Sequence, residues 1–244
     1  MAAYDDFAWF YNRYWSEEFH AAAFPILERI WLPQVPAGGR VLDICCGTGY
    51  LARLLTDRGF RVTGVDESAA MIGYARENAP RAEFHVAGAA EFSLPGRFDA
   101  AVSTFDSLNH LIGADLLAAA FRRTAAALEP GAPFAFDILT EEAYQTHWGE
   151  NFVLVRDDHV LAITGGGYDF RSRLSSCTIT MFRRIAGEWR RSDAVVDEQA
   201  YEPREIDEAL ERAGFGAIVC YDARDLGMAG QLGVGRTFYV ATKR

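Results

Sequence analysis

The residues best suited to chemistry lie at 41–52, where an apolar run gives way to glycines at Gly47 and Gly49. Glycine lets backbone N–H groups approach a ligand closely, and the N-terminus of a following helix favours electron-rich groups. Asp66 ends the next apolar run, where a carboxylate with two acceptor oxygens suits a ribose diol. The stretch therefore predicts a binding loop for a ligand that carries a ribose.

This loop alone does not choose between two kinds of ligand. Residues 47–52 also satisfy the dinucleotide pattern GxGxxG/A, in which an acidic residue such as Asp66 contacts the ribose. A nicotinamide-dependent oxidoreductase is therefore one interpretation of the pattern.

A second polar group follows the apolar run at 98–103 and reads Ser-Thr-Phe-Asp-Ser-Leu-Asn-His over residues 103–110. Histidine titrates near neutral pH, so His110 or Asp106 could remove a proton from an amine or a hydroxyl. The alternative for His110 is a capping or hydrogen-bonded surface residue. His147, which lies beside Trp148, is a further candidate base.

Strand-like and helix-like patterns alternate through the first part of the chain and must position these groups. The predicted strands are 40–46, 61–66, 82–87, 98–105 and 133–139, and the predicted helices are 47–59, 68–78 and 115–131. This alternation predicts an α/β fold with a doubly wound, mostly parallel sheet covered by helices on both faces. In such folds ligands bind at the carboxyl ends of the strands.

The pattern changes after residue 140. Segments 151–165, 167–187 and 188–201 are typical of an antiparallel β-meander, with turns at Gly165–Gly167 and Gly187–Glu188. A helix at 203–215 and strands at 217–222 and 236–243 follow. We expect the meander to be an insertion above the C-terminal edge of the main sheet.

Aromatic residues crowd positions 4–31 with largely helical spacing, which predicts one or two amphipathic helices laid on the core. The expected organisation is an N-terminal helical lid at 1–36, a cofactor-binding core at 37–150, a β-meander substrate roof at 151–200, and the closing helix and strands at 201–244.

The chain has 244 residues, with 24 Lys and Arg against 34 Asp and Glu, so its net charge is −10. This charge disfavours nucleic acid and anionic lipid surfaces as partners. The acidic start and the lack of a long apolar run predict a cytoplasmic protein without a membrane partner. The four cysteines lack metal or redox spacing and are expected to be buried.

Several motifs in order resemble those of class I S-adenosyl-L-methionine-dependent methyltransferases. The segments that carry this resemblance are VLDICCGTG with Asp43, GVDESAAMI with Asp66 and Met71, FDAAVSTFDSLNHL, LEPGAPFAFDILT, and the closing pair AIVCYD and GRTFYVATKR. A nicotinamide enzyme is not expected to carry a carboxylate at Asp43. The resemblance covers residues 40–140 well and 200–244 fairly, and it implies a seven-stranded Rossmann-like sheet. The N-terminal aromatic helix is similar to the lid of amino-sugar N-methyltransferases.

The resemblance also implies a cofactor site for S-adenosyl-L-methionine. Its residues would be Tyr11, Tyr14, Asp43, Cys45, Gly47, Gly49, Asp66, Glu67, Met71, Gly88, Ala89 and Thr104. The family usually carries an acidic residue after the third strand to bind the adenine amino group, and this chain has Gly88-Ala89-Ala90-Glu91 there. Adenine recognition would then depend on the backbone at Ala89 or on Glu91.

The expected activity is methyl transfer to a nitrogen or oxygen of a small molecule by in-line displacement, with no metal. Two alternatives remain open, a nicotinamide-dependent oxidoreductase and a non-catalytic S-adenosyl-L-methionine-binding protein. The expected oligomeric state is a monomer or a homodimer. Six arginines of the meander leave an anionic acceptor open, namely Arg171, Arg173, Arg183, Arg184, Arg190 and Arg191.

Overall fold

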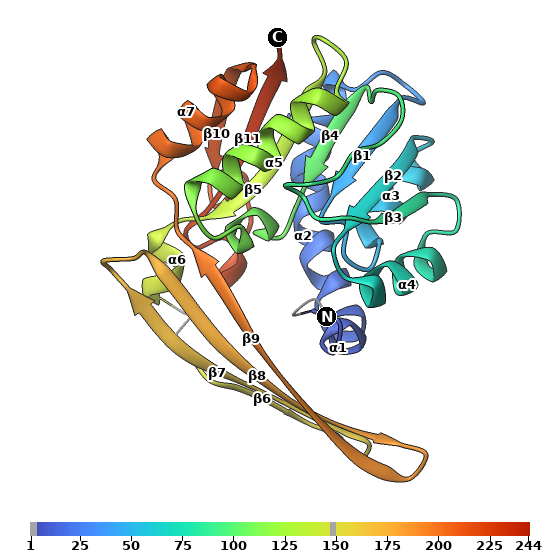
Figure 1. Cartoon of the computed structure of the whole chain (residues 1–244), viewed down its shortest axis with the longest axis vertical. Coiled ribbons are helices and arrows are strands. Elements are labelled where there is room, and N and C mark those ends of the chain that lie inside the picture. The colour runs from blue at the N-terminus through green and yellow to red at the C-terminus, as the bar shows by residue number, and fades with distance from the viewer. Residues whose placement is uncertain (1–3, 147–149) are drawn as a thin grey trace.

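The computed structural model describes residues 4–146 and 150–244 and contains two β-sheets with helices around the larger one (Figure 1). The α-helices are α1 (Ala8–Tyr14), α2 (Ser16–Ile30), α3 (Tyr50–Asp57), α4 (Ala69–Asn78), α5 (Ala114–Ala127), α6 (Glu141–Thr146) and α7 (Pro203–Ala213). The strands are β1 (Arg40–Ile44), β2 (Arg61–Asp66), β3 (Glu83–Val86), β4 (Ala100–Ser103), β5 (Pro133–Leu139), β6 (Phe152–Val155), β7 (His159–Asp169), β8 (Leu174–Ile185), β9 (Glu188–Gln199), β10 (Phe215–Asp222) and β11 (Arg236–Lys243). Short 3₁₀ helices are η1 (Leu32–Gln34), η2 (Ser107–His110) and η3 (Gly230–Leu232).

The main sheet has the strand order β10-β11-β5-β4-β1-β2-β3. Strand β11 runs antiparallel to β5 and β10, and the other neighbouring pairs are parallel. From β1 the chain adds β2 and β3 on one side, and it then returns to add β4 on the other side of β1. The strand order therefore reverses between β1 and β4, and open α/β sheets bind ligands at such a point. The predicted doubly wound, mostly parallel seven-stranded sheet is confirmed.

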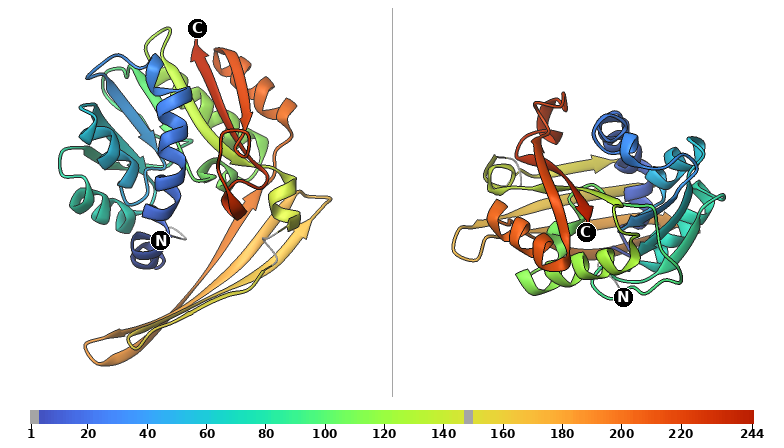
Figure 2. Two further views of the ribbon diagram at one scale, coloured as in Figure 1. Left: turned by 180° about the vertical axis from the view of Figure 1, so that it is seen from behind. Right: turned by 90° about the horizontal axis from the view of Figure 1, so that it is seen from above.

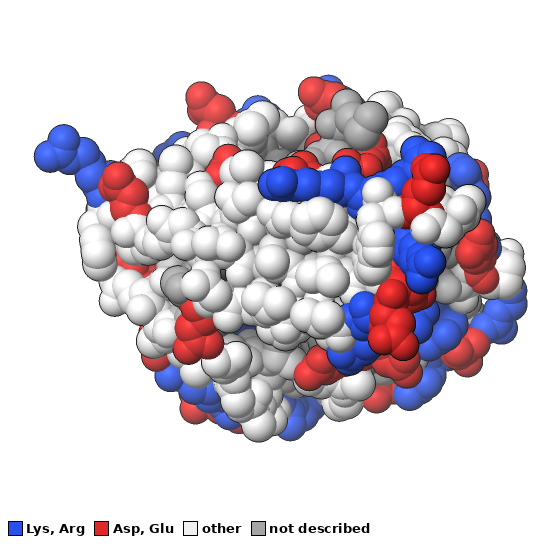
Figure 3. Space-filling model, turned by 90° about the horizontal axis from the view of Figure 1, so that it is seen from below, with Lys and Arg blue, Asp and Glu red and all other residues white. Residues whose placement is uncertain are grey.

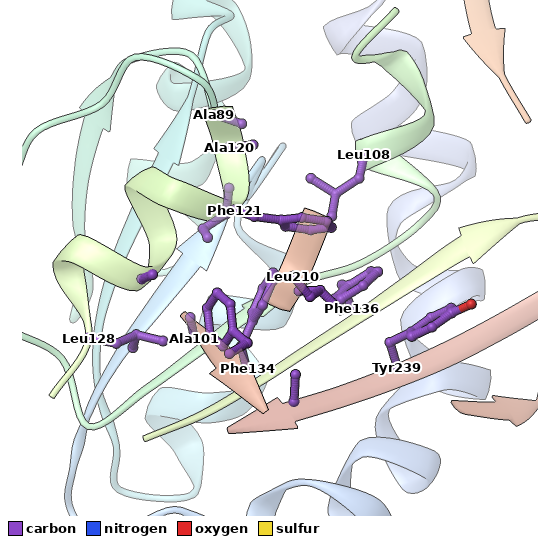
Figure 4. Close-up of a cluster of buried hydrophobic side chains, with 14 of the residues drawn as sticks. Ala89, Ala101, Leu108, Ala120, Phe121, Leu128, Phe134, Phe136, Leu210 and Tyr239 are labelled. Carbon is purple, nitrogen blue, oxygen red and sulfur yellow. The ribbon is translucent and has the colours of Figure 1, made fainter. Parts of the chain in front are cut away.

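Helices cover both faces of this sheet because its inner strands are apolar on both sides. Helices α5 and α7 pack on one face, and α2, α3 and α4 pack on the other, as the two views of Figure 2 show. Side chains of β1 alternate between these layers, with Leu42 and Ile44 in the first and Val41 in the second. Figure 4 shows the first layer, in which the rings of Phe136 and Tyr239 stack at 5.0 Å.

The N-terminal aromatic segment forms two helices, α1 and α2, that pack on different parts of the molecule. Phe24 and Leu27 of α2 are buried against the main sheet. Phe7, just before α1, and Phe10, within it, instead belong to a buried cluster with Ile179 of the second sheet. Helix α1 therefore lies between the core and the second sheet.

The second sheet is a four-stranded antiparallel meander in the order β6-β7-β8-β9, and it projects from one end of the core (Figure 1). Viewed from below, the molecule shows charged side chains mainly towards its edges (Figure 3). The meander exposes several apolar side chains, among them Val153, Val155, Trp189 and Val195.

The turn expected at Gly165–Gly167 is wrong, because these glycines lie inside β7. A register shift between Gly165 and Tyr168 marks a bulge there, and a Cβ on Gly166 would lie 2.7 Å from the Ser176 carbonyl oxygen. Glycine at this position serves the close approach of two strands rather than a reversal. The reversal follows Asp169, whose carboxylate accepts hydrogen bonds from the backbone N–H groups of the next turn.

Two further details differ from the sequence predictions. Helix α6 occupies a segment for which no helix was predicted. The cysteines are not uniformly buried, since Cys46 and Cys177 are buried, Cys45 is half-buried and Cys220 is exposed on β10.

Within the described residues, no helix combines the length and apolarity that a membrane crossing requires.

Candidate active site

Two cavities adjoin at the carboxyl end of the main sheet. The smaller has a volume of about 120 Å³ and lies over the loops that follow β1, β2 and β4. The larger has a volume of about 600 Å³ and lies between the core, α1 and the meander. Both are lined by Tyr4, Tyr11, Phe105 and His110, so the two spaces meet at these side chains.

The smaller cavity brings together much of the predicted cofactor site. Its lining includes Tyr11, Cys45, Gly47, Asp66, Glu67, Met71 and Ala89, together with the candidate base His110. These residues come from α1, from α4 and from the segments at or after the ends of β1, β2, β3 and β4. Parallel strands place their carboxyl ends at one edge, which explains why distant motifs meet here.

Asp66 organises the glycine loop. Its Oδ2 accepts the backbone N–H of Gly47 at 2.9 Å, and its Oδ1 accepts the N–H of Ser68 at 2.9 Å. Each oxygen keeps a second lone pair for a ligand hydroxyl. Burial raises the pKa of Asp66 to about 6, against the lowering effect of these two hydrogen bonds. Gly47 itself has a φ of 52°, which glycine adopts without the strain that a side chain brings.

Asp43 lies behind this loop on β1, is 1% exposed and lines neither cavity. Its Oδ2 has no hydrogen-bond partner among the described residues. Burial, followed by the nearby Asp66 carboxylate, raises the pKa of Asp43 well above its usual range. An unpartnered buried carboxyl oxygen is costly unless a donor or a cation reaches it. This property fits a ligand with an ammonium group, such as the methionine end of S-adenosyl-L-methionine.

The two tyrosines expected in the lid have different surroundings. The ring of Tyr11 lies 3.5 Å from the point where a Cβ on Gly47 would stand, so it covers the glycine loop. Tyr14 lines only the larger cavity, and its hydroxyl lies 2.5 Å from Nε2 of the buried His159 on β7. Tyr14 therefore connects α1 to the meander.

The loop after β4 is held in a strained conformation. Phe105 and Asp106 have φ values of 64° and 49°, which residues other than glycine rarely adopt. Asp137, at 1% exposure on β5, accepts both of their backbone N–H groups, at 2.7 and 3.0 Å. Arg236 on β11 forms ion pairs with Asp137 and with Asp106, the latter at 2.7 Å. Burial alone would lower the pKa of Arg236, but the carboxylates of Asp106 and Asp137 raise it.

His110 sits where the two cavities meet. Its Nδ1 lies 3.1 Å from the Asp197 carbonyl oxygen, which can only accept, so Nδ1 carries a hydrogen. In the neutral ring Nε2 is then an acceptor, and the Tyr4 hydroxyl lies 3.0 Å from it. Burial lowers the pKa of His110, against the raising effect of Asp106. A neutral imidazole with an accepting Nε2 is the form that a general base needs.

The remaining predicted residues lie outside the smaller cavity. Gly49 begins α3, where a Cβ would lie 2.9 Å from the Ala75 Cα. Gly88 accepts two backbone N–H groups through its carbonyl, and Glu91 lines neither cavity. The Thr104 hydroxyl lies 3.2 Å from Nε2 of His20 on α2. His147 lies outside the described residues.

Several residues that sequence reasoning missed belong to this region. They are Tyr4, Phe105, Asp137, Glu198 and Arg236. An aspartate inside the otherwise apolar segment 133–139 was a visible signal for Asp137, because a buried carboxylate requires partners. No motif marked Glu198, and Arg236 lies in the closing segment GRTFYVATKR without a role having been predicted for it. The six meander arginines named above line neither cavity.

Comparison with known proteins gives consistent matches. Residues 41–131 match the family model described as a methyltransferase domain. The putative methyltransferase YqeM of Bacillus subtilis is 26% identical over 187 residues, covering 74% of this chain and 75% of the relative. The dTDP-3-amino-3,6-dideoxy-alpha-D-glucopyranose N,N-dimethyltransferase of Streptomyces fradiae is 40% identical over 95 residues, covering 39% of this chain and 37% of the relative.

Solved structures give the same fold over the whole chain. An S-adenosylmethionine-dependent methyltransferase from Clostridium acetobutylicum aligns with a TM-score of 0.80 at 21% identity, covering 99% of each chain. This likeness extends beyond the domain match to the N-terminal helices and the meander.

Proposed function

The chain belongs to the S-adenosyl-L-methionine-dependent methyltransferases, and from that premise we propose that it methylates a nitrogen or an oxygen of a small molecule. The observation that carries the proposal is the meeting of the two cavities at Tyr4, Tyr11, Phe105 and His110. A methyl donor in the smaller cavity and a methyl acceptor in the larger one would approach each other at this junction. A relative that methylates a sugar amine supports a small-molecule acceptor.

In this proposal the cofactor is held by the residues of the smaller cavity. Asp66 accepts the ribose hydroxyls, the backbone at Cys45 and Gly47 faces the methionine part, and Met71 packs on the adenine. Asp43 receives the amino group, directly or through water. The Ala89 backbone reads the adenine edge, since Glu91 lies elsewhere. When bound, S-adenosyl-L-methionine supplies an electrophilic methyl group on a sulfonium.

The larger cavity is proposed to hold the acceptor, with residues 1–36 acting as the lid and 151–200 as the roof. Tyr11 covers the glycine loop and Tyr14 joins α1 to the meander, so closure of α1 would shield both cavities from water. His110 is the favoured general base because its Nε2 can accept a proton. Asp106 is committed to Arg236 and positions the loop.

The first experiment measures binding and turnover with the whole protein. Calorimetry with S-adenosylhomocysteine and NADH in parallel should detect only the former. Turnover is then followed as S-adenosylhomocysteine formation across a panel of amines, alcohols and carboxylates. Tight cofactor binding without turnover on any member would favour a non-catalytic binding protein.

His110→Gln tests the proposed base. Turnover should fall by about 10²- to 10⁴-fold, while the affinity for S-adenosylhomocysteine stays within about twofold. His85→Gln is the matched control, because the side chain of His85 is 38% exposed beside Glu83. Equal turnover in both variants would remove His110 from the chemistry.

A further inference from the structure

The larger cavity is apolar over most of its wall. Apolar side chains from the α1 region and the meander line it, including Phe7, Trp15, Leu154, Ile163, Ile179 and Val196. Its volume of about 600 Å³ is within the range of pockets that hold drug-sized ligands. A largely apolar molecule gains free energy by filling such a space, whereas a strongly hydrated one must give up its water.

The charged groups of this cavity are predominantly acidic. Among the described residues that line it, the acidic ones are Glu18, Asp106, Glu150 and Glu198, and the basic one is Arg236. Arg236 already pairs with Asp106 and with Asp137 behind it. This arrangement opposes an anionic acceptor such as a nucleotide diphosphate and favours a cationic one.

The acidic groups converge at the end of the cavity next to His110. Glu198 on β9 is 2% exposed, and its Oε2 accepts the hydroxyl of Tyr144 at 2.8 Å. Its Oε1 lies 3.4 Å from His110 Nε2. One carboxylate oxygen of Asp106, one of Glu198 and one nitrogen of His110 all lie within 4.8 Å of one another. An ammonium group, with several N–H donors on one atom, matches this set of acceptors.

The surroundings of Glu198 disfavour its charged form. Burial, then the charge of Asp106, raises the pKa of Glu198 well above its usual range, against the lowering effects of the Tyr144 hydrogen bond and of Arg236. A buried carboxylate is strongly stabilised only when a positive partner is close. Tyr144 fixes one oxygen and leaves the other directed towards His110.

We propose that the acceptor is a largely apolar molecule with one basic amine, and that Glu198 binds its ammonium group beside His110. This inference rests on the proposed function and narrows the acceptor class. The proposed acceptor also differs from the sugar nucleotide in the name of one relative, which carries a diphosphate.

The test uses isosteric probes on the full chain saturated with S-adenosylhomocysteine. Tryptamine, its alcohol tryptophol and its acid analogue indole-3-acetate share one apolar ring and differ in charge. D-glucosamine supplies an amine without the apolar body. Calorimetry should show tryptamine binding at least tenfold more tightly than each of the other three.

Two variants assign the preference to Glu198. Glu198→Gln keeps the shape and an acceptor for Tyr144 but removes the charge, so it should lose most of the preference for tryptamine over tryptophol. Glu198→Asp should restore part of it. Glu188→Gln, on the same strand but with a side chain 80% exposed, should behave like the parent protein. Unchanged affinity for S-adenosylhomocysteine shows that each variant is folded.

Three results would overturn the inference while leaving the methyltransferase assignment intact. These are a preference for the alcohol or the acid, a tryptamine preference that survives in Glu198→Gln, and glucosamine binding as tight as tryptamine. Stoichiometric Mn²⁺ or Zn²⁺ uptake that Glu198→Gln abolishes would also overturn it, by making the cluster a metal site. Failure of the parent protein to bind S-adenosylhomocysteine would instead overturn the proposed function.

Discussion

At the scale of single residues, Asp66 does two tasks with one carboxylate. It holds the glycine loop through Gly47 and the start of α4 through Ser68, and it still presents free lone pairs to the smaller cavity. Its type and position at the end of β2 were readable from the sequence. Its raised pKa was not, because that depends on how the surrounding chain excludes water.

Asp66→Asn should weaken S-adenosylhomocysteine binding by about 10- to 150-fold. Hydrogen bonds to a charged group contribute about 1.5–3 kcal/mol, and the amide offers one acceptor oxygen in place of two. Calorimetry at pH 8 provides the dissociation constants. Asp225→Asn, in an exposed loop, should leave them unchanged. A loss of less than threefold at Asp66 would exclude it from ribose recognition.

The pH dependence of cofactor binding should also follow Asp66. In the folded protein the pKa of Asp66 is about 6, above its ordinary value of 3.8. Protonation of Asp66 therefore adds to the free energy of unfolding, and this contribution is complete below about pH 4. That contribution is lost as pH rises through 6. Binding has the opposite trend, because the ionised carboxylate is the better acceptor.

Affinity for S-adenosylhomocysteine should therefore rise by up to about tenfold per pH unit between 5 and 6 and level off above 7. Calorimetry at pH 5, 6, 7 and 8 measures the slope. The Asp66→Asn variant should show a flatter profile. The same slope in both proteins would assign the titration to another group.

At the scale of elements, the loop after β4 depends on two other strands. Phe105 and Asp106 adopt left-handed backbone conformations that Asp137 on β5 and Arg236 on β11 hold in place. The sequence indicated that polar groups gather after β4, since the run 103–110 is visibly polar. It gave no sign that Arg236, at the start of the last strand, supplies the counter-charge, because that contact forms only when β11 inserts beside β5.

Arg236→Met should lower the free energy of unfolding by about 3–5 kcal/mol, because it leaves two buried carboxylates without a positive partner. Urea unfolding monitored by circular dichroism measures the change. Arg224→Met is the matched control, since Arg224 also bridges two carboxylates but does so at the surface. Its unfolding midpoint should barely move. Similar midpoints for both variants would mean that the buried pairs do not hold the loop.

At the scale of the whole molecule, the core and its two additions enclose two cavities, to which the proposed function gives different tasks. The ends of the core strands, covered by Tyr4 and Tyr11, line the smaller cavity, and α1 with the meander completes the larger one. The apolar contacts of Phe7 and Phe10 with Ile179 connect the two additions to each other. The acceptor space therefore requires both of them together.

Ile163→Trp should fill part of the larger cavity without reaching the smaller one, because Ile163 lies on β7 and lines only the former. Tryptamine binding should weaken at least tenfold, while S-adenosylhomocysteine affinity stays within twofold. Val195→Trp is the control, since Val195 lies on β9 and is 57% exposed. A parallel loss of both ligands would show that the two cavities are not independent.

The sequence by itself determined the alternating α/β architecture, the glycine loop, Asp66 and the polar run before His110. These features follow from local periodicity and from chain order, because parallel strands bring their carboxyl ends to one edge. Only the tertiary structure decided that the larger cavity is lined mainly by apolar side chains, with more acidic than basic groups among them, and that the meander arginines lie away from it. Glu198 and Arg236 are far in the chain from His110 and Asp106, and no motif gave either of them a role. Long-range packing alone therefore gives them their neighbours, their burial and their charge partners.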